Sequence, residues 1–235
     1  MKARYFLSSM VAFAASAAAV FGQGTVVVND PTKTAAETKL SKTDETVFSR
    51  DALPRVRTQI ASDVCTESVE VAGVVNGAFT KAGAKQTLLF YQFCQTGNGL
   101  GWVGLVLIED GKISGNYISD GGWSADIGVV PDINQNGLSE FTLAYSGGMH
   151  QGQGGIGVDI MEFSNGLPKG IGWYKAEEYA DTQATTVWKL TAHPGKTPIF
   201  YRQKYFSGEG EKWRRFGSNL AFKLGKAYSK FEAVK

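Results

Sequence analysis

The stretch that decides the fold is Asp132-Ile133-Asn134-Gln135-Asn136-Gly137-Leu138-Ser139-Glu140, which lies between two apolar runs. Side chains that carry oxygen stand at its first, third, fifth and ninth positions, around a glycine at the sixth. A tight turn directs alternate side chains inward, and glycine permits the sharp bend. This arrangement is typical of a loop that binds a hard cation such as Ca²⁺. The expected ligands are Asp132, Asn134, Asn136, the carbonyl of Leu138, and Glu140.

An alternative interpretation of the loop stays open, because Asp and Asn side chains also satisfy their own backbone in turns without any ion. An EF-hand is excluded, since the twelfth position is Leu143 rather than a bidentate Glu and the flanking runs are of the β type. With only two carboxylates among the ligands, we expect a modest calcium affinity, with a Kd of about 10⁻⁴–10⁻³ M.

From about residue 67 onward, β-branched and aromatic runs alternate with glycines, a pattern that predicts β-strands. Two dipeptides between such runs, Asp110-Gly111 and Asn165-Gly166, predict tight hairpins. The expected strands are Ser68–Val75, Gln86–Cys94, Trp102–Glu109, Lys112–Ser119, Ala125–Val130, Glu140–Ser146, Ile156–Phe163 and Leu167–Trp173, with four or five more between Ala184 and Ala233. Upstream, a short helix is expected at about Thr43–Ala52, before Pro54.

These features recur at a nearly constant spacing. The second hairpin dipeptide follows the first by 55 residues, and Gly137 follows Gly83 by 54. The spacing predicts an all-β, antiparallel fold of tandem four-stranded, blade-like units that form a partial-propeller or sandwich-like body. The units would span about residues 67–120 and 121–174, with a diverged unit at 175–235, all within a single β domain at 51–235.

In this frame, Gly77–Leu89 is a degenerate copy of the loop and strand at Pro131–Leu143. Phe79 then matches Ile133, and Gln86 matches Glu140. The copy lacks the other ligands, because Ala78, Thr80 and Ala82 stand where Asp132, Asn134 and Asn136 stand in the second loop.

The segment Val129–Leu143 resembles an FG-GAP/VCBS-type repeat, in which a strand leads into a D-x-[DN]-x-[DN]-G-x-x-[DE] loop and then into an apolar strand. The resemblance covers about 20 residues well and about 110 loosely. It implies an extracellular β architecture in which Ca²⁺ holds the loop closed, and it implies no common reaction. The chain departs from the pattern at Glu140, where Asp is usual, in the lost ligands of the first copy, and in having too few units to close a propeller.

Residues 1–22 are expected to be a signal peptide. Lys2 and Arg4 precede an apolar run from Tyr5 to Phe21, and small residues follow. The alternative is a retained membrane anchor, for which the run is barely long enough. Export predicts a secreted or periplasmic protein without a membrane span in the mature chain. Residues 23–50 are polar and are expected to be a disordered linker.

The remaining composition bears on partners and on redox state. Without the leader the formal net charge is zero, but residues 196–235 carry +7 and the rest −7. Such an asymmetry is typical of a solvated surface or of one facing an anionic partner. The two cysteines, Cys65 and Cys94, are expected to form a disulfide in an oxidising compartment, the alternative being two buried thiols.

A candidate ligand surface comprises Trp123, Asp126 and, in a glycine-rich loop, His150. The alternatives are a core tryptophan and a solvent loop. No G-x-S-x-G or H-E-x-x-H motif occurs, so no catalytic residue is assigned. The sequence therefore favours an exported, non-catalytic module that binds a protein or glycan, and not nucleic acid. A secreted hydrolase whose carboxylates meet only in the fold, or a purely structural envelope protein, is the alternative.

Overall fold

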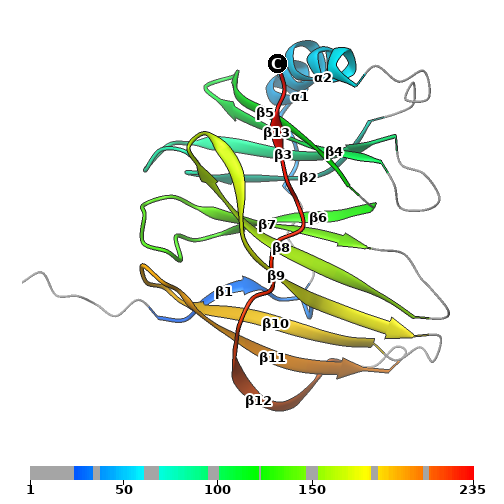
Figure 1. The fold of residues 1–235 in the computed structure, drawn as a ribbon, viewed down its shortest axis with the longest axis vertical. Helices are drawn as coiled ribbons and strands as arrows, with labels where there is room; N and C mark the ends of the chain where they lie inside the picture. Colours follow the sequence, from blue (N-terminus) through cyan, green and yellow to red (C-terminus); the bar gives the residue numbers. More distant parts are fainter. Residues whose placement is uncertain are drawn as a thin grey trace, which may run out of the picture.

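The computed structural model describes residues 24–33, 38–60, 69–94, 101–121, 123–146, 153–180, 185–208 and 212–235. Within these ranges the protein is mostly β, with antiparallel sheets stacked below a short helical segment (Figure 1). The prediction of an antiparallel β fold is confirmed. Among the described residues, no helix is long and apolar enough to cross a membrane.

The first sheet contains four strands that are consecutive in the chain and a short fifth strand from the C-terminus. The consecutive strands are β2 (Glu70–Gly77), β3 (Gln86–Phe93), β4 (Trp102–Glu109) and β5 (Lys112–Asp120). The fifth, β13 (Glu232–Ala233), pairs with the outer edge of β5. Chain neighbours are therefore sheet neighbours, as expected for strands joined by short turns.

The second sheet has eight strands among the described residues; seven follow one another in chain order and curl over, and the eighth, β1 (Val26–Asn29), pairs with β10. The seven are β6 (Trp123–Val130), β7 (Glu140–Ser146), β8 (Gln153–Ser164), β9 (Leu167–Ala180), β10 (Thr185–His193), β11 (Ile199–Ser207) and β12 (Arg214–Phe222). The long strand β9 pairs with β8 along most of its length but with β10 only at Glu177–Tyr179. The sheet turns over at this point, so that β10–β12 form a separate layer beneath β6–β9 (Figure 1).

Three apolar cores separate these layers. Between the helical segment and the first sheet, Phe48 packs on Tyr91 with ring centroids 5.0 Å apart. Between the first sheet and β6–β9, Phe79, Phe141 and Phe163 form an aromatic cluster with centroid distances of 5.5–6.4 Å. A third core, between β6–β9 and β10–β12, contains Ile133. Phe79 and Ile133 come from the two matching loops, so each loop buries the residue at its second position.

The two predicted hairpins are present. Asp110 and Gly111 join β4 to β5 with φ angles of 50° and 69°. Asn165 and Gly166 join β8 to β9 with φ angles of 52° and 76°. Positive φ at both central residues gives the turn twist that matches paired antiparallel strands.

The helical segment is longer than predicted. It runs through α1 (Lys42–Val47), the wide π-type turn η1 (Phe48–Ala52) and α2 (Leu53–Gln59). Ser41 caps α1, its hydroxyl accepting a hydrogen bond from the amide of Asp44. Pro54 was expected to end the helix, but it lies in the first turn of α2, directly after the wide turn η1, and the helical course continues through it.

The prediction of a disordered linker at 23–50 was wrong for part of that range. Besides the start of the helical segment, it contains β1 (Val26–Asn29), which pairs with β10. Val28 is buried in the third core, and Asn29 donates a 2.6 Å hydrogen bond to the Tyr174 hydroxyl. A tertiary partner strand therefore orders a segment whose polar neighbours predict disorder. The expected signal peptide lies outside the described residues.

The C-terminal segment connects the layers. It runs upward across their edges and ends beside the helices (Figure 1). The fully buried carboxylate of Asp159, in β8, accepts hydrogen bonds from the amides of Tyr228 and Ser229 at 2.7–3.2 Å. Gly225 pairs with Trp173 in β9. One chain segment thus tethers both sheets.

Candidate functional site

The candidate cation loop, residues 131–139, connects β6 to β7. Gln135 and Gly137 adopt positive φ angles of 61° and 85°. The sequence predicted this conformation at the glycine but not at Gln135. With both residues left-handed, the loop coils tightly enough for its own side chains to reach its main chain.

The side-chain oxygens of the loop accept hydrogen bonds from its own amides. The two carboxylate oxygens of Asp132 accept from the amides of Asn136 (3.1 Å) and Gly137 (2.7 Å). The Asn134 Oδ1 accepts from the Asn136 amide at 3.1 Å, and the Asn136 Oδ1 accepts from the Leu138 amide at 2.8 Å. These contacts match the ion-free alternative. They are also compatible with cation binding, because each oxygen has a second lone pair.

Glu140, the first residue of β7, is fully buried. Its Oε2 accepts a hydrogen bond from the Ile133 amide at 2.9 Å, whereas Oε1 has no partner among the described residues. Burial raises the pKa of Glu140 to about 7. The Ile133 hydrogen bond opposes this rise, and the charges of Asp132 and Glu162 add to it. A buried carboxylate oxygen without a donor requires either a proton or a cation.

Glu162, in β8, is a site residue that the sequence analysis missed. Its Oε2 accepts hydrogen bonds from Nδ2 of Asn134 (2.8 Å) and of Asn136 (3.4 Å). These contacts hold the amide nitrogens against β8 and therefore turn the amide oxygens back toward the loop. Only the pairing of β7 with β8, in which Phe141 lies opposite Met161, brings Glu162 beside the loop.

Carboxylates alone do not make a metal centre here. Among the described residues, no three His, Cys, Asp or Glu side chains are grouped so that they could hold a metal ion. A cation in this loop would also need the two asparagine oxygens and the Leu138 carbonyl, together with Asp132 and Glu140. Neutral oxygen ligands of this kind suit Ca²⁺, which takes six to eight oxygens in flexible geometry.

The first loop, between β2 and β3, has the same buried hydrogen bond at its matching position, but protein atoms satisfy the whole side chain there. Gln86 is almost fully buried, and its Oε1 accepts hydrogen bonds from the amides of Phe79 (2.9 Å) and Thr80 (3.0 Å). Its Nε2 donates to the Thr80 hydroxyl at 2.6 Å and to Glu109 at 2.9 Å. Both ends of the buried side chain are therefore satisfied by protein atoms.

The two loops lie side by side. The Ser139 amide donates to the Ala78 carbonyl at 2.9 Å, and the Ala78 amide donates to the Ser139 hydroxyl at 3.3 Å. The turn after β10 joins them, because the Gly195 amide donates to the Ile133 carbonyl at 2.9 Å. The candidate cation loop is thus held between two neighbouring turns at one end of the sheets.

The other candidate ligand surface lies elsewhere. Trp123 begins β6 and pairs with Ser146, the last residue of β7, so it lies at the opposite end of the sheet from the loop. Asp126 lies between these ends, and its carboxylate accepts a 2.7 Å hydrogen bond from the Ile127 amide. His150 lies outside the described residues. Trp123 and the cation loop therefore do not form one site.

The predicted disulfide involves one residue outside the described ranges. Cys94 follows β3 and packs against the core beneath the helices. Cys65 is not among the described residues, so the Cys65–Cys94 bridge stays a prediction.

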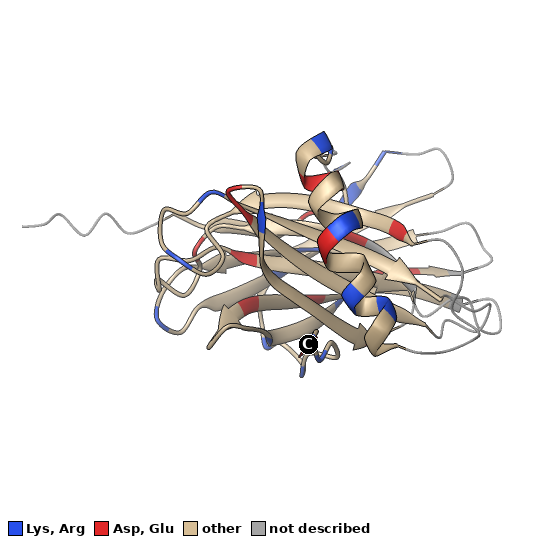
Figure 2. Ribbon diagram, turned by 90° about the horizontal axis from the view of Figure 1, so that it is seen from above, with Lys and Arg blue, Asp and Glu red and all other residues tan. Residues whose placement is uncertain are grey.

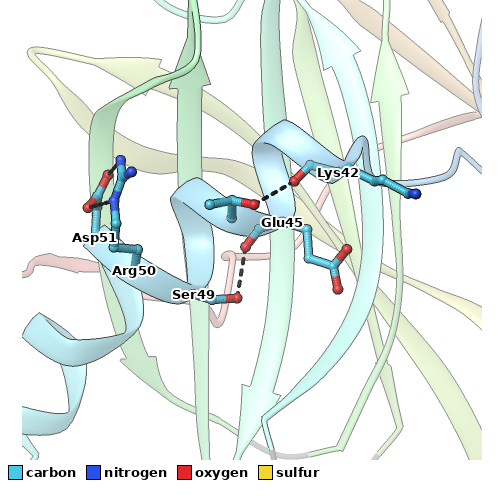
Figure 3. Close-up of polar contacts among 6 residues, drawn as sticks. Lys42, Glu45, Ser49, Arg50 and Asp51 are labelled. Carbon is cyan, nitrogen blue, oxygen red and sulfur yellow. Dashed lines mark hydrogen bonds and ion pairs between the residues drawn. The ribbon is translucent and has the colours of Figure 1, made fainter.

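An open depression on the helical segment carries no site. It is lined by Glu45, Thr46, Ser49 and Arg50. Two of these side chains bond their own helix: the Thr46 hydroxyl donates to the Lys42 carbonyl and the Ser49 hydroxyl to the Glu45 carbonyl (Figure 3). Arg50 binds Asp51 through two hydrogen bonds of 2.6–2.7 Å. Viewed from above, residues of both charge signs lie along the helices (Figure 2), as on a solvated surface.

Comparisons of the chain with protein-family models, with curated proteins and with solved structures gave no match.

Proposed function

We propose that this protein is an exported, non-catalytic β-repeat module in which Ca²⁺ closes the Asp132–Glu140 loop and which binds a protein or glycan. The single observation that carries the calcium assignment is the fully buried Oε1 of Glu140, which has no hydrogen-bond partner among the described residues. Asp132 and Glu162 are close enough to raise the pKa of this carboxyl, so negative charge collects at one place. A divalent cation would bind the unpartnered oxygen and would also reduce the repulsion among the three carboxylates.

The first loop supports this assignment as an internal comparison. The Nε2 group of Gln86 donates to Thr80 and to Glu109, so a partly positive group fills the place that the cation would take in the second loop. In the second loop the matching residue, Glu140, carries an oxygen there. We therefore interpret the first loop as an ion-independent relative of the second.

The strand arrangement supports the repeat interpretation. β2–β5 and β6–β9 are each four consecutive antiparallel strands, and each run begins with a loop-containing strand pair and ends with a hairpin of two positive-φ residues. The amide-to-carbonyl contacts from Ser139 to Ala78 and from Gly195 to Ile133 join successive loops in similar ways. We assign β2–β5 and β6–β9 as two blade-like units and β10–β12 as a diverged third.

The buried acid favours a structural role over a catalytic one. Glu140 is 0% exposed, so a substrate has no access to the carboxyl whose pKa is raised. A general acid must lie within hydrogen-bond reach of the reacting group. We therefore interpret Glu140 as part of the loop's closure rather than as one carboxylate of a hydrolase.

Calorimetric titration with CaCl₂ tests the proposal. We expect the parent to bind one Ca²⁺ with a Kd of about 10⁻⁴–10⁻³ M and the Asp132→Ala variant to give no binding heat. Glu109→Gln is the matched control, because Glu109 contacts Gln86 of the first loop, and it should bind as the parent does. Circular dichroism establishes that each variant is folded. Absence of binding by the parent, or equal binding by Asp132→Ala, would overturn the proposal.

Export is tested separately, by sequencing the N-terminus of protein recovered from the culture medium or the periplasm. We expect the mature chain to begin near Gln23. Recovery of the intact chain beginning at Met1, inside the cell, contradicts this part of the proposal.

A further inference from the structure

Strand β12 is the outer edge of the curled sheet, and it is exposed on both faces. Among the described residues, it pairs with β11 on one side and has no strand on the other. Every residue from Arg214 to Ala221 is exposed. Two of them are large and apolar, Phe216 at 66% and Leu220 at 65% exposure. An edge strand presents main-chain amide and carbonyl groups to any extended chain that can lie beside it.

The two apolar side chains share one face with cations of the neighbouring strand. Phe216 lies opposite Lys204, and Leu220 lies opposite Arg202. The Lys204 ammonium is 5.3 Å from the centroid of the Phe216 ring, and the Arg202 guanidinium is 4.4 Å from that of Phe222. Cation–π contacts of this kind fix the positive groups beside the exposed apolar strip.

The surrounding sequence is strongly positive. Residues 185–231 contain ten Lys and Arg residues against two acidic residues, Glu209 and Glu211, a formal net charge of +8. One of these cations, Lys189, is paired with Asp30 at 2.8 Å, away from the edge. The net field along β10–β12 therefore favours an acidic partner and opposes a second copy of the same edge.

The edge is held rigidly from within. The register of β11 with β12 shifts between Arg202 and Lys204, beside Gly217, whose φ is 69°. Gln203 fills this bulge: its Nε2 donates to the carbonyls of Lys204 (3.0 Å), Phe216 (2.9 Å) and Gly217 (3.3 Å). Its Oε1 accepts from the Arg215 Nε at 2.9 Å. A strand fixed in this way loses little entropy when a partner strand is added.

We propose that β12 is the docking edge for an extended acidic segment of a partner protein, which adds to the sheet as a further strand. Main-chain hydrogen bonds to β12 would supply part of the affinity. Apolar side chains of the segment would cover Phe216 and Leu220, and its carboxylates would lie on the opposite face, the face of Arg215. The positive charges of Arg202 and Lys204, on β11, would add to the attraction. This proposal names the partner chemistry of the module and does not depend on the calcium loop, which lies on other strands.

A labelled nine-residue peptide of alternating Glu and Val, as long as β12, is the first probe. We expect it to bind the full chain, to bind more weakly as salt is raised, and to bind at least about tenfold more tightly than an alternating Lys–Val peptide. The same Glu–Val peptide with alternate amides N-methylated should lose most of its affinity, because it cannot complete the strand hydrogen bonds. No binding, or equal binding of the three peptides, overturns the proposal.

Variants locate the surface. Leu220→Glu and Lys204→Glu each place a negative charge at the edge and should weaken Glu–Val binding by about tenfold or more. Lys112→Glu, on an exposed residue of β5, makes the same charge change on the other sheet and should leave binding unchanged. Equal loss in all three variants would mean non-specific charge attraction and would contradict a site at β12.

Further measurements distinguish the acidic segment from two other possible occupants of the edge, a second copy of this chain and a glycan. Sedimentation equilibrium should show a monomer, and a dimer abolished by Leu220→Glu would mean that a second copy occupies the edge, against this proposal. Peptide binding should be the same in CaCl₂ and in chelator, so failure of the calcium assignment leaves this result intact. Tighter binding of a sulfated polysaccharide than of the Glu–Val peptide, still lost in Leu220→Glu, would replace the protein partner by a glycan and overturn it.

Discussion

Gln86 and Glu140 make the same contact in two successive loops. The side chain of each accepts a hydrogen bond of 2.9 Å from the amide seven residues earlier, that of Phe79 in the first loop and of Ile133 in the second. They differ at the other end of the side chain, where Gln86 has a donor with two partners and Glu140 has an oxygen with none among the described residues. The first loop is satisfied by protein atoms alone, whereas the second leaves a buried oxygen that takes either a proton or a cation.

The first loop should therefore contribute the same stability with or without calcium. Replacing Gln86 by Ala leaves the buried amide of Phe79 and the partly buried amide of Thr80 without this acceptor, which should lower the free energy of unfolding by about 1–3 kcal/mol. Urea unfolding should give an equal loss in CaCl₂ and in chelator. A loss confined to one condition would show that the first loop also responds to the ion.

The buried carboxyl of Glu140 should give a pH dependence in the absence of calcium. Its pKa is raised from an ordinary value of 4.5 to about 7, so the folded protein holds the proton more tightly than the unfolded chain. This stabilisation is complete below about pH 4.5 and is lost as the pH rises through about 7. In chelator, the urea midpoint should fall between about pH 5 and pH 8 by more in the parent than in Glu140→Gln, which cannot ionise.

The same titration should be suppressed when calcium is bound, because the cation takes the place of the proton. Calcium affinity should accordingly fall as the pH is lowered below about 7. If the urea midpoints of the parent and of Glu140→Gln in chelator change equally with pH, the Glu140 carboxyl does not titrate in this range. That outcome would contradict the role assigned to Glu140.

Asp159 should control the attachment of the C-terminal segment. Its buried carboxylate binds the amides of Tyr228 and Ser229, so Asp159→Ala should lower the free energy of unfolding by about 2–4 kcal/mol. Limited proteolysis should then cut near residues 223–231 faster than in the parent. Asp159→Asn, which keeps one acceptor oxygen, should show a smaller effect. Unchanged cleavage in Asp159→Ala would mean that other contacts hold the C-terminal segment in place and would contradict this role of Asp159.

The cysteine pair gives a prediction that does not depend on the loops. Mass spectrometry of the non-reduced protein should find one peptide that contains both Cys65 and Cys94. Closing a loop of about 30 residues should stabilise the fold by roughly 3–4 kcal/mol through the unfolded chain. Alkylation of two thiols without prior reduction would contradict the bridge.

The sequence predicted the strands well because local signals determine them. Trp102–Glu109 and Glu140–Ser146 have the predicted bounds, since both are apolar runs that begin or end at turn residues. β9 was predicted to end at Trp173 but runs on to Ala180. Its second half, with Glu177 and Glu178, is too polar to be recognised as a strand, and pairing with β8 and β10 keeps it extended.

The site was only partly predictable for the same reason. Asp132, Asn134, Asn136 and Glu140 are close in the chain, so their spacing revealed them. Glu162 is 22 residues beyond Glu140 and reaches the loop only through the β7–β8 register, which a single sequence does not specify. The burial of Glu140, which makes its unpartnered oxygen significant, likewise depends on layers that pack from distant parts of the chain.

Thermal unfolding of parent and Asp132→Ala, each in about 5 mM CaCl₂ and in chelator, tests the central claim most directly. For a Kd of about 10⁻⁴–10⁻³ M, calcium should stabilise the parent by about 1–2.3 kcal/mol. In a domain of this size that raises its Tm by about 2–9 °C. Asp132→Ala should melt at one temperature in both solutions. Equal melting of the parent with and without calcium, or an equal calcium shift in Asp132→Ala, would contradict a cation in this loop.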